Sequence, residues 1–274
     1  MKDFINERWR PVLARNGLAD FDALWLHKAA WFEEPNARRG GWSGVTRCEL
    51  APHEGGALAV FLKRQENHGT PSLRHPLQGE PTFRREFRCI MRYRACGIPT
   101  PEPVFFGMRR SAGGHRAILV TEELTGFLSL EERVGRWLAH GAPTRPIRIR
   151  HIEAVAALLR TMHRHGIQHN CFFPKHVFTR AASDGRVEAR VIDLEKSRWR
   201  PLKTLCALRD LDTLNRYSQG WSRCDRMRFF KAYMQTDRLT PYAKWLWRAV
   251  ASRSLRKSRQ TQQRALAARD GVAE

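Results

Sequence analysis

The sequence has no apolar run long enough to cross a bilayer, and its longest runs, such as Ala57 to Leu62, are far too short. It also has no paired cysteine spacing, because its 6 cysteines are scattered along the chain. Its first residues include Asp3, Glu7 and Arg8 where a secretory signal would have an apolar segment. These features predict a cytoplasmic protein with reduced thiols, whose contact with any membrane would be peripheral.

Acidic residues are scarce. Of the 274 residues, 49 are basic and 27 are acidic, which gives a formal net charge of +22. A field of this sign attracts polyanions such as nucleic acid, anionic lipid headgroups, nucleotide phosphates or a phosphorylated glycan. Nucleic-acid binding is an alternative that rests on charge alone, because the sequence has no helix-turn-helix, zinc finger or aromatic RNA-binding motif.

The N-terminal half predicts strands with few helices. Apolar positions at helical spacing between Phe4 and Phe32, Ala29 included, indicate two short helices. Phe83, Phe87, Ile90 and Met91 would form the apolar face of a third helix. The elements expected after the two short helices are the strands Val45 to Leu50, Ala57 to Lys63, Val104 to Gly107 and Arg116 to Val120, and the helix Thr82 to Cys96, which Gly97 would stop.

The C-terminal half is predicted to be mainly helical, and its clearest helix is Arg148 to His165, with Gly166 as its stop. An antiparallel hairpin interrupts the helices. Its strands are the β-branched runs Val177 to Arg180 and Val187 to Ile192. His176 precedes the first strand and Asp193 follows the second. The two side chains are therefore expected side by side at the open end of the hairpin.

This order of parts resembles the α+β, bilobal protein-kinase-like fold, with an N-terminal antiparallel sheet carrying one helix and a mainly helical C-terminal lobe. The segments KRQENH, Glu86-Phe87 followed by GIPTP, HGIQHN and VIDLEKSR together resemble the bacterial lipopolysaccharide core kinase family, which includes Kdo and heptose kinases and InaA-type members. The resemblance covers roughly Gly40 to Tyr217. It implies ATP- and Mg²⁺-dependent phosphoryl transfer to a sugar of the lipopolysaccharide core or to another phosphorylated glycan.

The resemblance assigns Lys63 to the α- and β-phosphates of ATP, with Glu86 as its ion-pair partner. Arg64 is the rival cation. Glu80 and Glu102 are the rival carboxylates, and Glu86 is preferred to them because it lies inside the predicted helix.

Backbone groups would make the other nucleotide contacts. Gly41 to Gly44 would be the turn that covers the phosphates, although GGWSG departs from the G-x-G-x-x-G pattern. The connector Thr121 to Leu124, with Glu122 and Leu124, would pair with adenine through its backbone.

The resemblance assigns the metal to Asp193 and His176. It also makes Asp210 the buried helix aspartate that accepts hydrogen bonds from backbone N–H groups of the catalytic loop. Asp212 competes for that role.

One position departs from the family pattern. The loop that ends at His176 starts at His169, and the catalytic-base aspartate expected two residues later is Cys171. Loss of such a base typically lowers the rate roughly 10²–10⁴-fold. A pseudokinase that binds nucleotide without transferring phosphate is therefore an alternative function.

The same stretch allows a second metal chemistry. His163, His165, His169, Cys171 and His176 lie close together in the sequence, and clusters of this kind can hold Zn²⁺. Ordinary structural histidines are the competing interpretation, because no C-x-x-C companion exists.

The C-terminal segment is basic, with no acidic residue from Arg238 through Arg269 and with Trp245 and Trp247 among the cations. This composition is typical of a helix on an anionic membrane surface, and a solvated, partly disordered tail is the alternative. The expected division is an N-terminal helical extension at 1–35, an N-lobe at 36–121, a C-lobe at 122–237 and the basic segment at 238–274.

Overall fold

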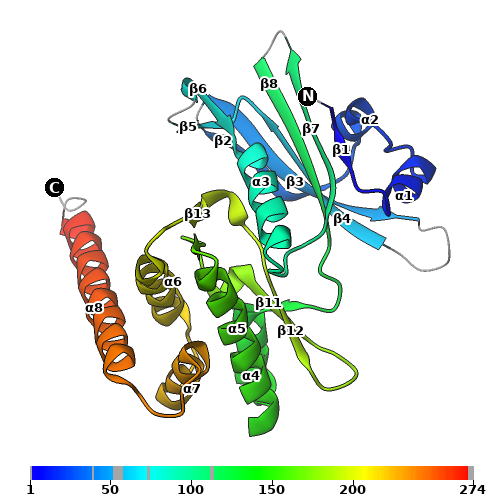
Figure 1. The fold of residues 1–274 in the computed structure, drawn as a ribbon. Helices are drawn as coiled ribbons and strands as arrows, with labels where there is room; N and C mark the ends of the chain where they lie inside the picture. Colours follow the sequence, from blue (N-terminus) through cyan, green and yellow to red (C-terminus); the bar gives the residue numbers. More distant parts are fainter. Residues whose placement is uncertain (1, 39, 52–57, 73–74, 112–113, 271–274) are drawn as a thin grey trace. The chain divides into compact units, whose positions relative to one another are not determined.

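The computed structural model describes residues 2–38, 40–51, 58–72, 75–111 and 114–270 (Figure 1). The chain divides into two compact units, Met1–Thr125 and Gly126–Glu274.

Unit 1 is built on an antiparallel six-stranded sheet in the order β1-β7-β8-β4-β3-β2. A two-stranded sheet, β5-β6, leads into helix α3. The elements are β1 (Phe4–Ile5), α1 (Arg10–Arg15), α2 (Phe21–Leu26), β2 (Trp31–Arg38), β3 (Gly41–Leu50), β4 (Leu58–Glu66), β5 (Gly69–Ser72), β6 (His75–Pro81), α3 (Thr82–Ala95), β7 (Pro103–Ser111) and β8 (Gly114–Glu122).

The two short helices, the four strands and helix α3 confirm the elements predicted for this half, although the bounds differ. Ala57, the predicted start of β4, lies outside the described residues. The prediction was wrong beyond α2, where Phe32 belongs to strand β2 instead of a helix and Ala29 precedes that strand. It was also wrong for Met91, which is 39% exposed, whereas Tyr93 of the same helix is buried.

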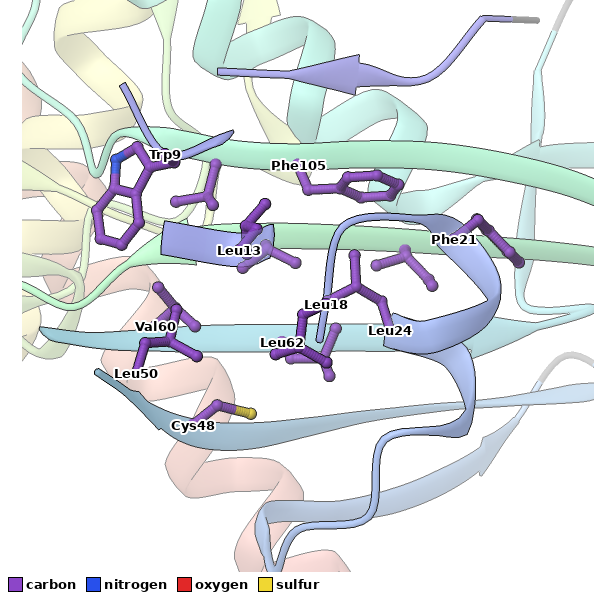
Figure 2. Close-up of a cluster of buried hydrophobic side chains, with 13 residues drawn as sticks. Trp9, Leu13, Leu18, Phe21, Leu24, Cys48, Leu50, Val60, Leu62 and Phe105 are labelled. Atoms are coloured by element: carbon purple, nitrogen blue, oxygen red, sulfur yellow. The ribbon is translucent and has the colours of Figure 1, made fainter. Parts of the chain in front are cut away.

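One face of the sheet packs against α1 and α2 (Figure 2). Fully burying a Leu, Val, Ile or Phe side chain contributes about 1.5–3 kcal/mol to the free energy of unfolding. The N-terminal residues therefore belong to the core of unit 1. The cluster consists of Trp9, Leu13, Leu18, Phe21, Leu24, Cys48, Leu50, Val60, Leu62, Val104, Phe105, Ile118 and Val120.

The other face packs against α3. Phe105 belongs to the cluster under α1 and α2, and the next residue, Phe106, stacks on Phe87 of α3 with ring centroids 4.4 Å apart. Successive side chains of a strand point to opposite faces. On β4 the same alternation puts Leu62 under α1 and α2 and directs Lys63 to the face that α3 covers.

Unit 2 is mainly helical, as predicted. Its strands form a three-stranded sheet, β12-β11-β9, and the pair β10-β13. The elements are β9 (Leu128–Ser129), α4 (Leu130–His140), α5 (Arg145–Arg164), β10 (Ile167–Gln168), the 3₁₀ turn Pro174–His176, β11 (Val177–Ala181), β12 (Val187–Val191), the 3₁₀ turn Leu194–Lys196, β13 (Arg198–Trp199), α6 (Lys203–Tyr217), α7 (Arg223–Met234) and α8 (Pro241–Asp270).

Two predictions for this half are confirmed. Helix α5 ends where Gly166 adopts φ +68°, a left-handed conformation that glycine takes without steric cost. Its start is three residues earlier than predicted, at Arg145. Strands β11 and β12 pair antiparallel from Val177 opposite Val191 to Ala181 opposite Val187.

Helix α8 buries one face within unit 2. Ala243, Leu246, Val250 and Ser254 recur at helical spacing and are all buried. The alternative of a solvated, disordered tail is therefore wrong for residues 243–254. Trp245 is 50% exposed. No helix in the described part of the chain is long and apolar enough to cross a membrane.

Candidate active site

Lys63 and Glu86 form the predicted ion pair, with Lys63 Nζ 2.6 Å from Glu86 Oε1. The pair is mostly shielded from water, because the two side chains are 20% and 8% exposed. The alternation of β4 explains the contact, since Lys63 faces the helix that carries Glu86.

The rival residues have other partners. Arg64 lies on the opposite face of β4, where its guanidinium donates to the carbonyl oxygens of Trp25 at 3.0 Å and His27 at 2.7 Å. Glu80 pairs with arginines of α3, and Glu102 accepts a hydrogen bond from the Trp9 indole. The structure therefore brings Lys63 and Glu86 together and gives the rivals structural roles.

The glycine-rich segment is placed differently from the prediction. Gly41 and Gly44 lie inside strand β3, and the turn before it contains Gly40 with φ +77°. Both strand glycines are required by close packing. A Cβ on Gly41 would collide with the carbonyl oxygen of Glu66, and one on Gly44 would lie 2.6 Å from the Trp31 ring.

The end of β8 and the connector after it are held by hydrogen bonds from three backbone N–H groups. The Glu122 N–H donates to the Glu102 carbonyl at 2.9 Å, and Glu122 Oε1 accepts from the Glu102 N–H at 3.0 Å. Glu123 N–H donates to the Ala59 carbonyl at 2.9 Å. Among the residues that the structure describes, the Leu124 N–H has no backbone acceptor.

His176 and Asp193 meet at the open end of the β11–β12 hairpin, as predicted, with Nδ1 3.3 Å from Oδ2. His176 Nδ1 also lies 2.9 Å from the carbonyl oxygen of Cys171. Burial lowers the pKa of His176, an effect that Asp193 opposes. The ring is therefore neutral at pH 7, with its proton on Nδ1 and a lone pair on Nε2.

Asp193 has a left-handed backbone, with φ 60° and ψ 57°. This conformation is uncommon outside glycine and is tolerated best by Asn and Asp. The carboxylate side chain is 31% exposed.

Asp210 holds the start of the loop between His169 and His176, which confirms the contacts predicted for this residue. It is fully buried on α6 and accepts hydrogen bonds from the backbone N–H groups of His169 at 2.7 Å and Asn170 at 2.9 Å. Its Oδ2 also lies 3.2 Å from His163 Nε2. Asp212 does not compete for the loop, because its contacts are with α8 and with Arg216 of its own helix.

His169 ties the loop to the end of the hairpin. Its Nε2 donates to the Ile192 carbonyl at 3.0 Å, and its Nδ1 accepts from the Cys171 N–H at 3.2 Å. Burial lowers the pKa of His169, which keeps the ring neutral.

Asn170 also ties the loop to the turn that follows the hairpin, a contact that the sequence did not predict. Its backbone is left-handed, with φ 67°, and its Nδ2 donates to the Lys196 carbonyl at 2.7 Å. The residue type could have indicated the left-handed backbone, because asparagine tolerates this conformation better than most residues.

Cys171 is buried at the position of the expected catalytic base, and burial raises the pKa of its thiol. A protonated thiol cannot accept a proton from a sugar hydroxyl. The loop nevertheless keeps its shape, since the Cys171 carbonyl accepts hydrogen bonds from His176 Nδ1 and, at 2.7 Å, from the Phe173 N–H.

The histidines of this stretch make structural hydrogen bonds. His163 contacts Asp210 and Tyr233 through its two ring nitrogens, and His169 contacts Ile192 and Cys171. Within the described ranges no group of three or more His, Cys, Asp or Glu side chains is placed to hold a metal ion. A zinc site therefore finds no support in these residues.

The chain has a protein-kinase-like fold. A solved structure described as WaaP in complex with acyl carrier protein has the same fold, with a TM-score of 0.66 over 95% of this chain and 99% of that chain, at 23% sequence identity.

The chain belongs to the lipopolysaccharide kinase (Kdo/WaaP) family, whose model matches residues 22–233. It is 32% identical over 209 residues to the InaA protein of Escherichia coli (strain K12), covering 75% of this chain and 91% of InaA. It is 30% identical over 189 residues to the lipopolysaccharide core heptose(I) kinase WaaP of Escherichia coli, covering 66% of this chain and 68% of WaaP.

Proposed function

We propose that the protein is an ATP- and Mg²⁺-dependent kinase that phosphorylates a sugar of the lipopolysaccharide core. The family supports the reaction class and the type of acceptor. The observation that carries the proposal is the contact of His176 with Asp193 beside a loop whose backbone N–H groups bind Asp210. These are the positions at which a kinase holds its metal and shapes its catalytic loop.

Unit 1 contributes the residues for nucleotide binding. Lys63 would bind the α- and β-phosphates, and Glu86 would hold the ammonium group in position. The backbone at Gly41 and Gly44 would approach the phosphates. The backbone of the connector at Glu122 and Leu124 would bind adenine, and the Leu124 N–H, which has no backbone acceptor among the described residues, would donate.

Unit 2 contributes the metal ligands. The carboxylate of Asp193 fits Mg²⁺, which binds proteins through one or two carboxylates and completes its coordination with substrate phosphates and water. His176 would present Nε2 and fix Asp193 through Nδ1. When bound with ATP, Mg²⁺ neutralises negative charge on the transferring phosphoryl group.

Cys171 favours a second candidate, the pseudokinase. With a buried thiol in place of the base, the chain would bind Mg-ATP and respond to it without transferring phosphate at a normal rate.

A transfer assay distinguishes the two candidates. The protein is incubated with γ-labelled Mg-ATP and lipopolysaccharide that lacks core phosphate, next to Asp193→Asn. Label that appears on the core with the wild type and not with the variant supports the kinase. Label on neither, together with Mg-ATP binding by the wild type, supports the pseudokinase. Equal label with both proteins contradicts the role of Asp193.

We also propose that α8 binds the cytoplasmic face of the inner membrane. Its exposed side chains include Lys244, Trp245, Arg248, Arg256 and Arg259. Each cation near an anionic surface contributes about 1 kcal/mol. Sedimentation with anionic vesicles tests this. Arg248→Gln/Arg256→Gln/Arg259→Gln should sediment less than wild type, and equal sedimentation with neutral vesicles contradicts the electrostatic account.

A further inference from the structure

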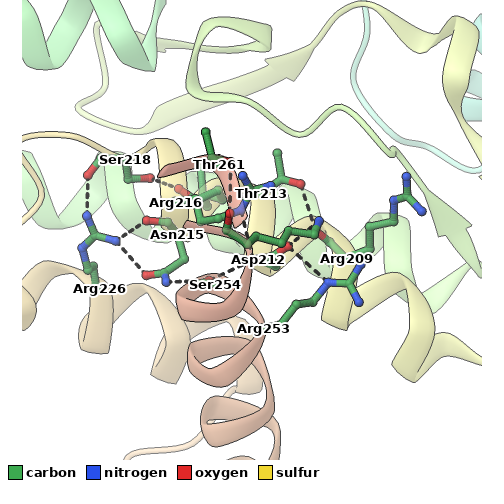
Figure 3. Close-up of polar contacts among 12 residues, drawn as sticks. Arg209, Asp212, Thr213, Asn215, Arg216, Ser218, Arg226, Arg253, Ser254 and Thr261 are labelled. Carbon is green, nitrogen blue, oxygen red and sulfur yellow. Dashed lines mark hydrogen bonds and ion pairs between the residues drawn. The ribbon is translucent and has the colours of Figure 1, made fainter. Parts of the chain in front are cut away.

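One buried carboxylate on α6 faces three cations. Asp212 is fully buried, and its oxygens lie 3.2 Å from Arg216 Nε, 3.2 Å from Arg253 Nε and 3.0 Å from Lys257 Nζ. Arg216 comes from the same helix, whereas Arg253 and Lys257 come from α8. Figure 3 shows Asp212 between the two helices, with Arg253 and Ser254 of α8 directed toward it.

The charges of this cluster do not balance. Asp212 carries a full negative charge, because its pKa is lowered by Lys257, Ser254 and Arg216 against the opposing effect of burial. One carboxylate offsets one cation and leaves two positive charges. No other carboxylate of the described residues pairs with these three cations. Helix α8 offers no acidic residue before Asp270, and Asp210 is occupied by the catalytic loop.

Two guanidinium groups of the cluster have N–H donors that Asp212 does not use. Arg216 and Arg253 each contact Asp212 through Nε, and within the part of the chain described here their terminal NH₂ groups have no hydrogen-bond acceptor. The three side chains are partly open to solvent, with Arg216 17%, Arg253 31% and Lys257 33% exposed. A ligand can therefore reach the donors from the surface.

The donors are also held in place. Asp212 Oδ1 accepts from Ser254 Oγ at 2.9 Å, and Ser254 Oγ accepts from Asn215 Nδ2 at 3.1 Å. Asn215 is itself bound by the guanidinium of Arg226 at 2.7 Å. The Arg216 guanidinium lies 4.9 Å from the centroid of the Tyr217 ring. A fixed carboxylate and a stacked guanidinium mean that less side-chain freedom is lost when a ligand binds.

We propose that Arg216, Arg253 and Lys257 form a binding site for a phosphate group, either inorganic phosphate or a phosphate monoester, at the junction of α6 and α8. Guanidinium groups bind phosphate through paired N–H donors, and a lysine ammonium binds it as a point charge. The phosphate dianion matches the two positive charges that Asp212 leaves. The site shares no residue with the proposed nucleotide and metal sites. Its occupant holds α8 on the helix that also carries Asp210.

Calorimetric titration with inorganic phosphate tests the site, at constant ionic strength and without nucleotide or Mg²⁺. The wild type should bind phosphate. Arg253→Gln/Lys257→Gln should bind at least about tenfold more weakly, a change worth about 1.4 kcal/mol. Arg248→Gln/Arg259→Gln is the matched control, because it removes the same charge from exposed positions of α8 and should bind like the wild type. Equal affinity in all three proteins, or no binding by the wild type, overturns the proposal.

A conservative variant covers the case in which the double variant does not fold. Arg253→Lys keeps the charge beside Asp212 and removes the paired N–H donors. It should fold and bind phosphate severalfold more weakly, and unchanged affinity contradicts the site as proposed. Lys63→Met should bind phosphate like the wild type, although the proposed function places Lys63 on the phosphates of ATP. Loss of binding in Lys63→Met would place the phosphate at the nucleotide site and would overturn the inference without affecting the proposed function.

Two further arms distinguish the source of the phosphate group. Glucose 6-phosphate represents a soluble sugar phosphate, and vesicles with phosphatidic acid represent a lipid headgroup. Loss of glucose 6-phosphate binding in Arg253→Gln/Lys257→Gln, or loss of a preference for phosphatidic acid over phosphatidylglycerol vesicles of equal surface charge, supports the site and identifies its source. The site is contradicted if Arg253→Gln/Lys257→Gln binds glucose 6-phosphate and the phosphatidic acid vesicles as strongly as the wild type does.

Discussion

Asp210 and Asp212, separated by a single residue on α6, hold different parts of unit 2. Asp210 accepts the backbone N–H groups of His169 and Asn170, whereas Asp212 binds Arg253, Ser254 and Lys257 of α8. Both carboxylates are fully buried. One helix therefore anchors the catalytic loop and the basic C-terminal helix.

Asp210→Asn should loosen the catalytic loop. The amide nitrogen of asparagine is a donor, so one of the two loop N–H groups loses its acceptor. A hydrogen bond to a charged group contributes about 1.5–3 kcal/mol. Hydrogen exchange should show faster exchange at residues 168–171. Asp212→Asn is the control and should instead accelerate exchange in the middle of α8. Unchanged protection of the loop in Asp210→Asn would contradict the anchoring role.

The ion pair of Lys63 and Glu86 should be coupled energetically. Lys63→Met leaves the Glu86 carboxylate, 8% exposed, without this cation. Breaking a buried pair costs about 3–5 kcal/mol, and the partial exposure of Lys63 reduces this to about 1–3 kcal/mol. Urea unfolding of the single variants and of Lys63→Met/Glu86→Gln should show that the double variant loses less than the sum. Additive losses would mean that the contact contributes nothing.

Cys171→Asp should raise phosphoryl transfer and leave nucleotide affinity nearly unchanged. A carboxylate at position 171 accepts the proton of the attacking hydroxyl, an effect typically worth about 10²–10⁴-fold in rate, and it does not act on ATP binding. Cys171→Ser is the control, because it changes the side chain without supplying a base. Ordinary kinase turnover by the wild type that slows in Cys171→Asp would show that another residue is the base.

Stability should fall between pH 6.5 and pH 4 partly because of His151. Burial, with Arg133, lowers the pKa of this residue from 6.5 to about 4. In that range the unfolded chain binds the proton more readily, so acid favours unfolding. The slope for one proton is about 1.4 kcal/mol per pH unit. Between pH 6.5 and pH 4, the free energy of unfolding of His151→Gln should decline less steeply than that of the wild type. Parallel curves for the two proteins within this range would contradict the assignment. Above pH 6.5 the two curves are expected to be parallel.

The fold was predictable where local pattern and geometry agree. The hairpin of β11 and β12 follows from two β-branched runs, and its geometry brings His176 to Asp193. Strand β2 was not predicted because Glu33, Glu34 and Pro35 argue against a strand. It is an edge strand with register shifts, the setting in which a sheet tolerates proline.

The site was only partly predictable, because some roles depend on contacts between residues distant in sequence. The role of Asp212 depends on α8, more than 40 residues further along the chain, as shown by its contact with Arg253. The strand glycines could not be placed from sequence alone, because the Trp31 ring that requires glycine at position 44 belongs to the unpredicted β2.

Thermal unfolding with and without Mg-ATP tests the central claim most directly. A ligand at about 100 times its dissociation constant stabilises the folded state by about 2.7 kcal/mol, which raises the midpoint of a chain of this size by about 5 °C or more. The account predicts this shift for the wild type and for Asp184→Asn, a control at the turn of the same hairpin. It predicts that Asp193→Asn loses the Mg²⁺-dependent part. The absence of any shift in the wild type at millimolar Mg-ATP would contradict the account.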